Sequence, residues 1–124
     1  MTGLVKDKKF KKNFQTLQEH SAESVGSGTL NVLSTPSMIA FMENTALMQI
    51  NLPPGQTTVG CCIKTNHLKP TAIGKEVEII STIEKIEGKF INYTIEAFVE
   101  NQKIGDAVHQ RVIIDTEKFL SKLF

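Results

Sequence analysis

The chain contains 124 residues, a length that fits one domain spanning residues 1–124 with a hydrophobic core of its own. The hydrophobic fraction is 40% and 14 Lys and Arg stand against 13 Asp and Glu, so we expect no nucleic-acid partner. We find neither a stretch of about 18 apolar residues that could span a membrane nor a secretory signal, and we expect a cytoplasmic protein without membrane contact.

The N-terminal part of the chain is basic, and two of its phenylalanines are expected to point inward. Residues 6–14 predict a solvated strand or arm in which Phe10 and Phe14 point inward. Gly26 and Gly28 then indicate a loop, which leads into a short apolar strand predicted at residues 30–33.

A long helix is predicted from about Pro36 to about Ile50. Ser34 and Thr35 supply capping hydroxyls, Pro36 suits the first turn, and the prolines that follow Asn51 end the helix. Apolar residues cover most of its circumference, which is typical of a buried helix. Because a small sheet covers only part of such a helix, we expect a second subunit.

Beyond Gly55 the hydrophobic pattern changes to the alternation of strands, at about residues 57–68, 75–87, 91–99 and 103–115. Short turns join the last three strands as hairpins, and a short helix is expected at residues 116–123. In the first of these strands, a regular alternation places one set of side chains on a common face: Val59, Cys61, Ile63, Thr65 and His67. The order predicts an α+β fold in which an antiparallel sheet of about five strands wraps around one long helix.

The only two cysteines, Cys61 and Cys62, are adjacent. Neighbours on a strand point to opposite faces, so we expect two reduced, partly buried thiols and no disulfide. Two cysteines and three scattered histidines supply too few ligands for zinc, and we expect neither a metal nor another cofactor.

Glu43 and His67 lie in unexpected surroundings. Glu43 is the one formally charged residue from Ser24 to Ile63, and it falls on the apolar predicted helix. A carboxylate there is costly unless it reaches solvent, is paired, or is catalytic. His67 lies near the end of an apolar strand face, where both a core or rim histidine and a catalytic base remain open interpretations.

Thr35 and Arg111 are further candidates. Thr35 suits the helix cap, and a cap can also present its hydroxyl and the N–H groups of the first turn to a developing oxyanion. Arg111 is the only arginine. Its planar fork could clamp a carboxylate or phosphate, although a surface ion pair is the default interpretation.

Two spacings give the chain a family resemblance. Thr35 is followed eight residues later by Glu43, and Gly60 is followed seven residues later by His67. Together with the glycines near position 27 and the segment 109–113, these residues resemble the hotdog-fold acyl-CoA thioesterases, in the branch typified by fluoroacetyl-CoA thioesterase.

The resemblance implies hydrolysis of the thioester of a small or medium acyl-CoA to the free acid and CoA. His67 would be the general base and acid, and Thr35 the hydroxyl that binds or attacks the acyl group. Glu43 would be the nucleophile or the carboxylate that orients water. Gly60 would donate its N–H to the oxyanion, and Arg111 is a further substrate-binding candidate. Whether Thr35 or Glu43 attacks remains open.

We expect a homodimer, or a tetramer, with active sites at the subunit interface where Thr35, Glu43 and His67 meet. Thr35 and Glu43 are about 12 Å apart by helical rise. Thr35 of one subunit would therefore face Glu43 and His67 of the other, or all three would line a longer acyl channel.

One departure from the family concerns residues 20–34, which contain no Phe, whereas the fluoroacetyl-selective lid carries one. We therefore do not extend fluoroacetyl selectivity to this chain. Two alternative functions remain open. One is a hotdog hydratase or dehydratase, although its His-x-x-x-Gly loop or Asp–His pair is missing near the helix, and the other is a non-catalytic acyl-CoA-binding module.

Overall fold

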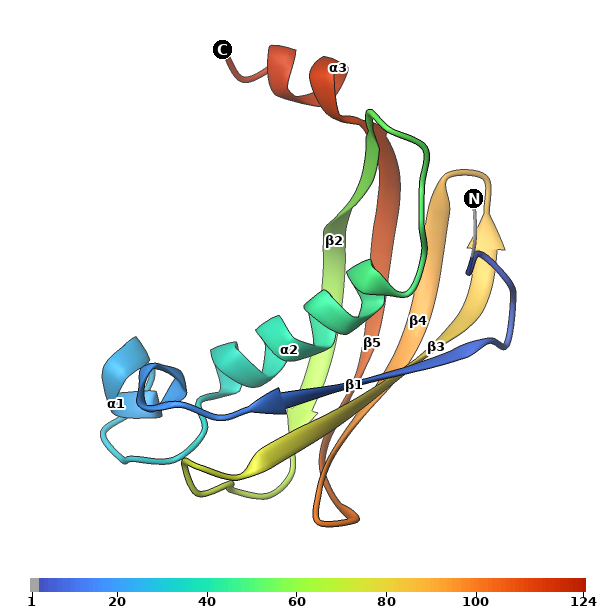
Figure 1. The fold of residues 1–124 in the computed structure, drawn as a ribbon. Coiled ribbons are helices and arrows are strands. Elements are labelled where there is room, and N and C mark those ends of the chain that lie inside the picture. Colours follow the sequence, from blue (N-terminus) through green and yellow to red (C-terminus); the bar gives the residue numbers. More distant parts are fainter. Residues whose placement is uncertain (1–2) are drawn as a thin grey trace.

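The structure is a computed structural model that describes residues 3–124. Its five strands form one antiparallel sheet in the order β1-β3-β4-β5-β2, which curves around the long helix α2 (Figure 1). This is the predicted hotdog fold. In chain order, the elements are β1 (Lys9–Gln15), the 3-10 helix η1 (Gln18–His20), α1 (Ala22–Val25), α2 (Thr35–Met48), β2 (Gln56–His67), β3 (Glu76–Glu87), β4 (Phe90–Val99), β5 (Gln102–Asp115) and α3 (Thr116–Ser121).

Helix α2 begins with a cap supplied by Ser34. The Ser34 side chain accepts a hydrogen bond of 3.1 Å from the N–H of Ser37, and Pro36 occupies the first turn, where its missing N–H leaves no donor unpaired. The helix therefore begins and ends within two residues of the predicted bounds. Because Ser34 is the cap, the hydroxyl of Thr35 is free for another partner.

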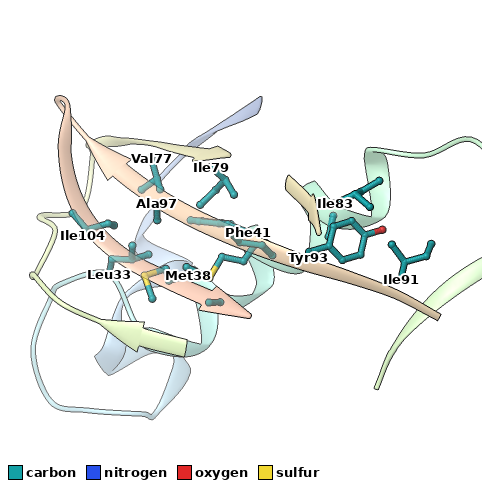
Figure 2. Packing of buried hydrophobic residues seen from close by; sticks show 14 of the residues in the cluster. Leu33, Met38, Phe41, Val77, Ile79, Ile83, Ile91, Tyr93, Ala97 and Ile104 are labelled. Atoms are coloured by element: carbon teal, nitrogen blue, oxygen red, sulfur yellow. The ribbon is translucent and has the colours of Figure 1, made fainter. Parts of the chain in front are cut away.

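The core lies between α2 and the sheet (Figure 2). Phe14 of β1 stacks on Phe41 of α2 with ring centroids 4.5 Å apart, which confirms that Phe14 points inward. Helix α2 is not buried all round in one chain, since Met48 is 54% exposed. The fully or nearly fully buried core residues of α2 and the central strands are Met38, Phe41, Met42, Ala46, Val77, Ile79, Ile83, Ile91, Tyr93, Ile95, Ala97, Ile104 and Ala107.

The strand predicted at residues 30–33 does not form. The chain before α2 folds instead as η1, α1 and a loop, held by the isolated bridges Ser21–Leu33 and Val32–Ala72. Gly26 has a φ of 86° and ends α1 in the left-handed conformation that glycine adopts without steric cost. A four-residue apolar run carries too little periodicity to distinguish a strand from an ordered loop.

Strand β2 contains a β-bulge. Gly60 pairs with Arg111 of β5, whereas Cys62 pairs with Gln110, so Cys61 is the extra residue. An inserted residue reverses the facing of every side chain beyond it.

Because of the bulge, the prediction that five side chains of β2 share one face is wrong. Gly60 faces α2 before the bulge, as its close approach to the helix shows, and Ile63 and Thr65 face the core side after it. Val59 and Cys61 therefore do not share the face of Ile63. The two thiols are free as expected, but they are exposed and not partly buried.

No helix within residues 3–124 has the length and apolar character needed to cross a membrane.

Candidate active site

The first part of the site is a contact between a threonine and a histidine. Thr35 Oγ1 lies 2.7 Å from Nδ1 of His67, a hydrogen bond between the first residue of α2 and the last residue of β2. The pair borders a pocket of about 310 Å³ between the segment that precedes α2 and the segment that follows β2. Its other lining residues are Ala22, Ser27, Val32, Leu33, Ser34, Leu68, Lys69 and Pro70.

Burial favours the neutral form of His67. Its Nε2 atom is covered by the chain and makes no hydrogen bond to any described residue. Burial lowers the pKa of His67 below its ordinary value of 6.5, because the charged ring loses hydration. A neutral imidazole can accept a proton through Nδ1, so the state favoured by burial is the one that a general base requires.

The second part of the site is the carboxylate of Glu43, which lies against the backbone of β2. A Cβ atom at Gly60 would lie 2.7 Å from Glu43 Oε2, closer than real Cβ contacts allow. Glycine at this position therefore creates the space that the carboxylate occupies. The Glu43 side chain is 39% exposed, so it reaches solvent beside the strand and is not isolated in the core.

Two buried side chains of β5 approach that carboxylate. Glu43 Oε2 lies 3.9 Å from Arg111 Nη1 and 3.9 Å from His109 Nε2. Arg111 is only 6% exposed, so the default interpretation of a surface ion pair is wrong. Its guanidinium donates to Thr58 through Nε to the hydroxyl, at 2.8 Å, and through Nη2 to the carbonyl, at 2.9 Å.

His109 was not assigned a role from the sequence. It precedes the only arginine by two residues on a strand, and this spacing places both side chains on one face, a signal that could have identified it. Burial is the main cause that lowers the pKa of His109. The nearby charge of Arg111 lowers it further, whereas the hydrogen bond to the Cys62 carbonyl and the charge of Glu43 raise it.

The structure does not bring the three predicted catalytic residues together in one chain. Thr35 contacts His67, but Glu43 lies beside Gly60, and Gly60 precedes His67 by seven residues, or about 23 Å of strand rise, along β2. The expected division of Thr35 and His67 between two subunits is wrong for this contact, because both belong to the same chain.

Within residues 3–124, no group of three or more His, Cys, Asp or Glu side chains is arranged to hold a metal ion.

Comparisons with known proteins show which family the chain belongs to. Residues 17–117 match the family of fluoroacetyl-CoA-specific thioesterases. The chain belongs to this family. The fluoroacetyl-CoA thioesterase of Streptantibioticus cattleyicolor is 29% identical to it over 94 residues, which cover 74% of this chain and 68% of that protein. The predicted family resemblance and the predicted enzyme class, an acyl-CoA thioesterase, are confirmed.

Solved structures share the fold of this family member. A fluoroacetyl-CoA thioesterase structure matches with a TM-score of 0.92 at 22% identity, covering 97% of this chain and 95% of that one. A thioesterase superfamily member from Thermus thermophilus matches with a TM-score of 0.88 at 22% identity, covering 99% and 93%. A hot-dog-like protein from Thermanaerovibrio acidaminovorans matches with a TM-score of 0.87 at 16% identity, covering 98% and 91%.

Proposed function

We propose that this thioesterase hydrolyses a small or medium acyl-CoA in the cytoplasm, as one hotdog domain over residues 1–124, with Thr35, His67 and Glu43 as catalytic residues. The observation that carries the proposal is the hydrogen bond of 2.7 Å between Thr35 and His67 at the border of a pocket. A hydroxyl hydrogen-bonded to a neutral imidazole is one arrangement that activates an oxygen for acyl transfer.

In the proposed reaction, neutral His67 accepts a proton at Nδ1 as an oxygen nucleophile attacks the thioester carbonyl. The nucleophile is either the Thr35 hydroxyl, which would give an acyl-enzyme that a water then hydrolyses to the free acid, or a water oriented by Glu43. The carbonyl oxygen gains charge, and the N–H of Gly60 stabilises it. Collapse of the intermediate breaks the C–S bond, and His67 returns its proton to the departing CoA sulfur.

A dimer would join the two parts of the site. Within the described residues β2 pairs only with β5, so its 12-residue outer edge is unpaired, and such edges favour pairing with another strand. In an antiparallel pair around a two-fold axis, Gly60 of one chain can lie opposite His67 of the partner subunit. That register would place Glu43 of one chain beside the Thr35–His67 pair of the other.

The size of the pocket supports a small or medium acyl group. The 310 Å³ space is lined by Ala22, Val32 and Leu33, so an acyl chain would contact short apolar side chains. One solved fluoroacetyl-CoA thioesterase is a complex with acetyl-CoA, a small acyl-CoA of the class proposed here.

The test is a panel of saturated acyl-CoA esters from acetyl upward, followed by the loss of thioester absorbance. Absorbance is the better readout because Cys61 and Cys62 are exposed and would react with a thiol reagent. We expect kcat/KM to rise over the short chains and then fall when the pocket is filled. Binding of the esters without turnover would instead identify a non-catalytic acyl-CoA-binding module.

A further inference from the structure

His109 is a buried histidine beside the site that the proposed reaction does not use. Its side chain is 0% exposed, so it cannot touch a substrate from its position on β5. Its Nδ1 atom lies 2.7 Å from the carbonyl oxygen of Cys62, and its Nε2 atom lies 3.1 Å from Arg111 Nη1. The ring of Tyr93 lies alongside it, with centroids 6.0 Å apart.

These two contacts fix the tautomer of His109. A carbonyl oxygen only accepts hydrogen bonds, so Nδ1 must carry the proton that is donated to Cys62. A guanidinium only donates, so Nε2 must present its lone pair to Arg111. Both requirements are met by one neutral tautomer, and a protonated ring would lose the bond to Arg111.

The contact with His109 completes the positioning of Arg111. Two nitrogens of the guanidinium donate to Thr58 and the third, Nη1, donates to His109, so all three nitrogens are hydrogen-bonded. Nη1 is also the atom that lies 3.9 Å from Glu43 Oε2. At that separation Arg111 supplies positive charge near the carboxylate but leaves its oxygens free for another hydrogen-bond donor.

The anchor of this chain of contacts is the β-bulge. Cys62 is the first paired residue after the inserted Cys61, and its carbonyl oxygen accepts the hydrogen bond from His109 Nδ1. The bulge therefore lies at one end of a path that runs through His109 and Arg111 to Glu43.

We infer that His109 is a positioning residue for the thioesterase reaction: as a neutral acceptor it aims the Arg111 guanidinium at the Glu43 carboxylate. The inference rests on the role proposed above for Glu43. His109 holds Arg111 in place, and the positive charge of Arg111, 3.9 Å from Glu43 Oε2, in turn favours the position of the carboxylate beside Gly60. Loss of the acceptor would slow the chemical step more than it would weaken binding of the acyl-CoA.

His109 also takes part in the pH dependence of the reaction. The titratable and charged groups around it and Arg111 are Glu43 from α2, Tyr93 from β4 and Cys61 from β2. Protonation of His109 would place two cations side by side and release Nη1. Protonation of His67 and protonation of His109 would then each lower activity in acid, so the acid limb of log kcat should be steeper than the slope of about one expected for a single group.

The test compares His109→Gln, whose amide oxygen can still accept from Arg111, with His109→Phe, which keeps the ring volume and removes the acceptor. We expect His109→Phe to lower kcat at least about tenfold with KM within about threefold of wild type. His109→Gln should retain most of kcat, and the slope of its acid limb should fall to about one. Melting temperatures show whether each variant is folded.

Equal losses in the two variants, or wild-type kcat in His109→Phe, would overturn the inference. If His109→Phe does not fold, the slope of the acid limb in His109→Gln decides, and an unchanged slope counts against the inference. Glu43→Gln is measured in parallel. Wild-type turnover in that variant contradicts the proposed function itself, whereas an inactive Glu43→Gln beside a fully active His109→Phe contradicts only the role of His109.

Discussion

The hydroxyl of Thr35 and the imidazole of His67 are hydrogen-bonded at 2.7 Å across the junction between the start of α2 and the end of β2. The Thr35 hydroxyl is not the cap of α2, because Ser34 caps the helix. The position of this hydrogen-bonded pair at the border of a pocket is what connects it to thioester chemistry.

Replacing Thr35 by Val should remove activity without removing stability. The substitution keeps the shape of the side chain but deletes the hydroxyl, and we expect kcat to fall about 100-fold or more. Thr35→Ser should retain much of the activity. Ser34→Ala is the matched control, because loss of the helix cap should cost about 1 kcal/mol of unfolding free energy while leaving the Thr35–His67 contact in place. A Thr35→Val enzyme with wild-type kcat would show that the hydroxyl takes no part in the reaction.

Gly60→Ala should displace the carboxylate of Glu43. The new Cβ would lie 2.7 Å from Oε2, so the side chain of Glu43 must move away from β2. We expect kcat to fall at least about tenfold, because the half-exposed Glu43 must rotate outward, and the melting temperature to fall modestly, because the new Cβ would also lie 3.1 Å from Cε1 of the buried His109. Lys64→Ala, an exposed position on the same strand, is the control and should behave as wild type. Equal activity in the two variants would argue against a fixed carboxylate.

Stability should decrease in mild acid. Burial lowers the pKa values of His67 and His109 in the folded chain below the ordinary 6.5. As the pH falls below 6.5, the unfolded chain therefore binds protons before the folded chain does, and the free energy of unfolding decreases. Urea unfolding at neutral pH and at a pH about one unit below 6.5 measures this change. A free energy that is constant or rises on acidification would contradict the buried, neutral state of the two rings.

The fold could be predicted from the sequence because the signals for its helix and strands are local. Pro36 after two hydroxyl residues marks the start of α2, and alternation identifies β3 and β4, whose inward residues such as Ile79 and Ile95 are buried. The bulge at Cys61 was missed because an inserted residue leaves no mark in composition, yet it changes the facing of β2. The spacing of His109 and Arg111 predicts a common face, but their approach to Glu43 could not be predicted without the pairing of β5 with β2.

Glu43→Gln should abolish turnover and leave the protein folded. The amide has nearly the same shape, but it cannot act as a nucleophile or accept a proton from water, and it carries no charge for Arg111. We expect kcat to fall by about 100-fold or more, while the melting temperature and the oligomeric state remain those of wild type. Hydrolysis at the wild-type rate would favour a site in which Glu43 has no catalytic role.

The central claim, that each site joins Thr35 and His67 of one chain to Glu43 of its partner, is tested most directly by a mixed dimer. Co-expression of two differently tagged chains, one with Thr35→Val and the other with Glu43→Gln, allows the heterodimer to be isolated. One of its two sites would then contain both defects and the other neither, so we predict about half of wild-type activity although both parent homodimers are inactive. A heterodimer as inactive as its parents, or a chain that does not dimerise, would contradict the shared site.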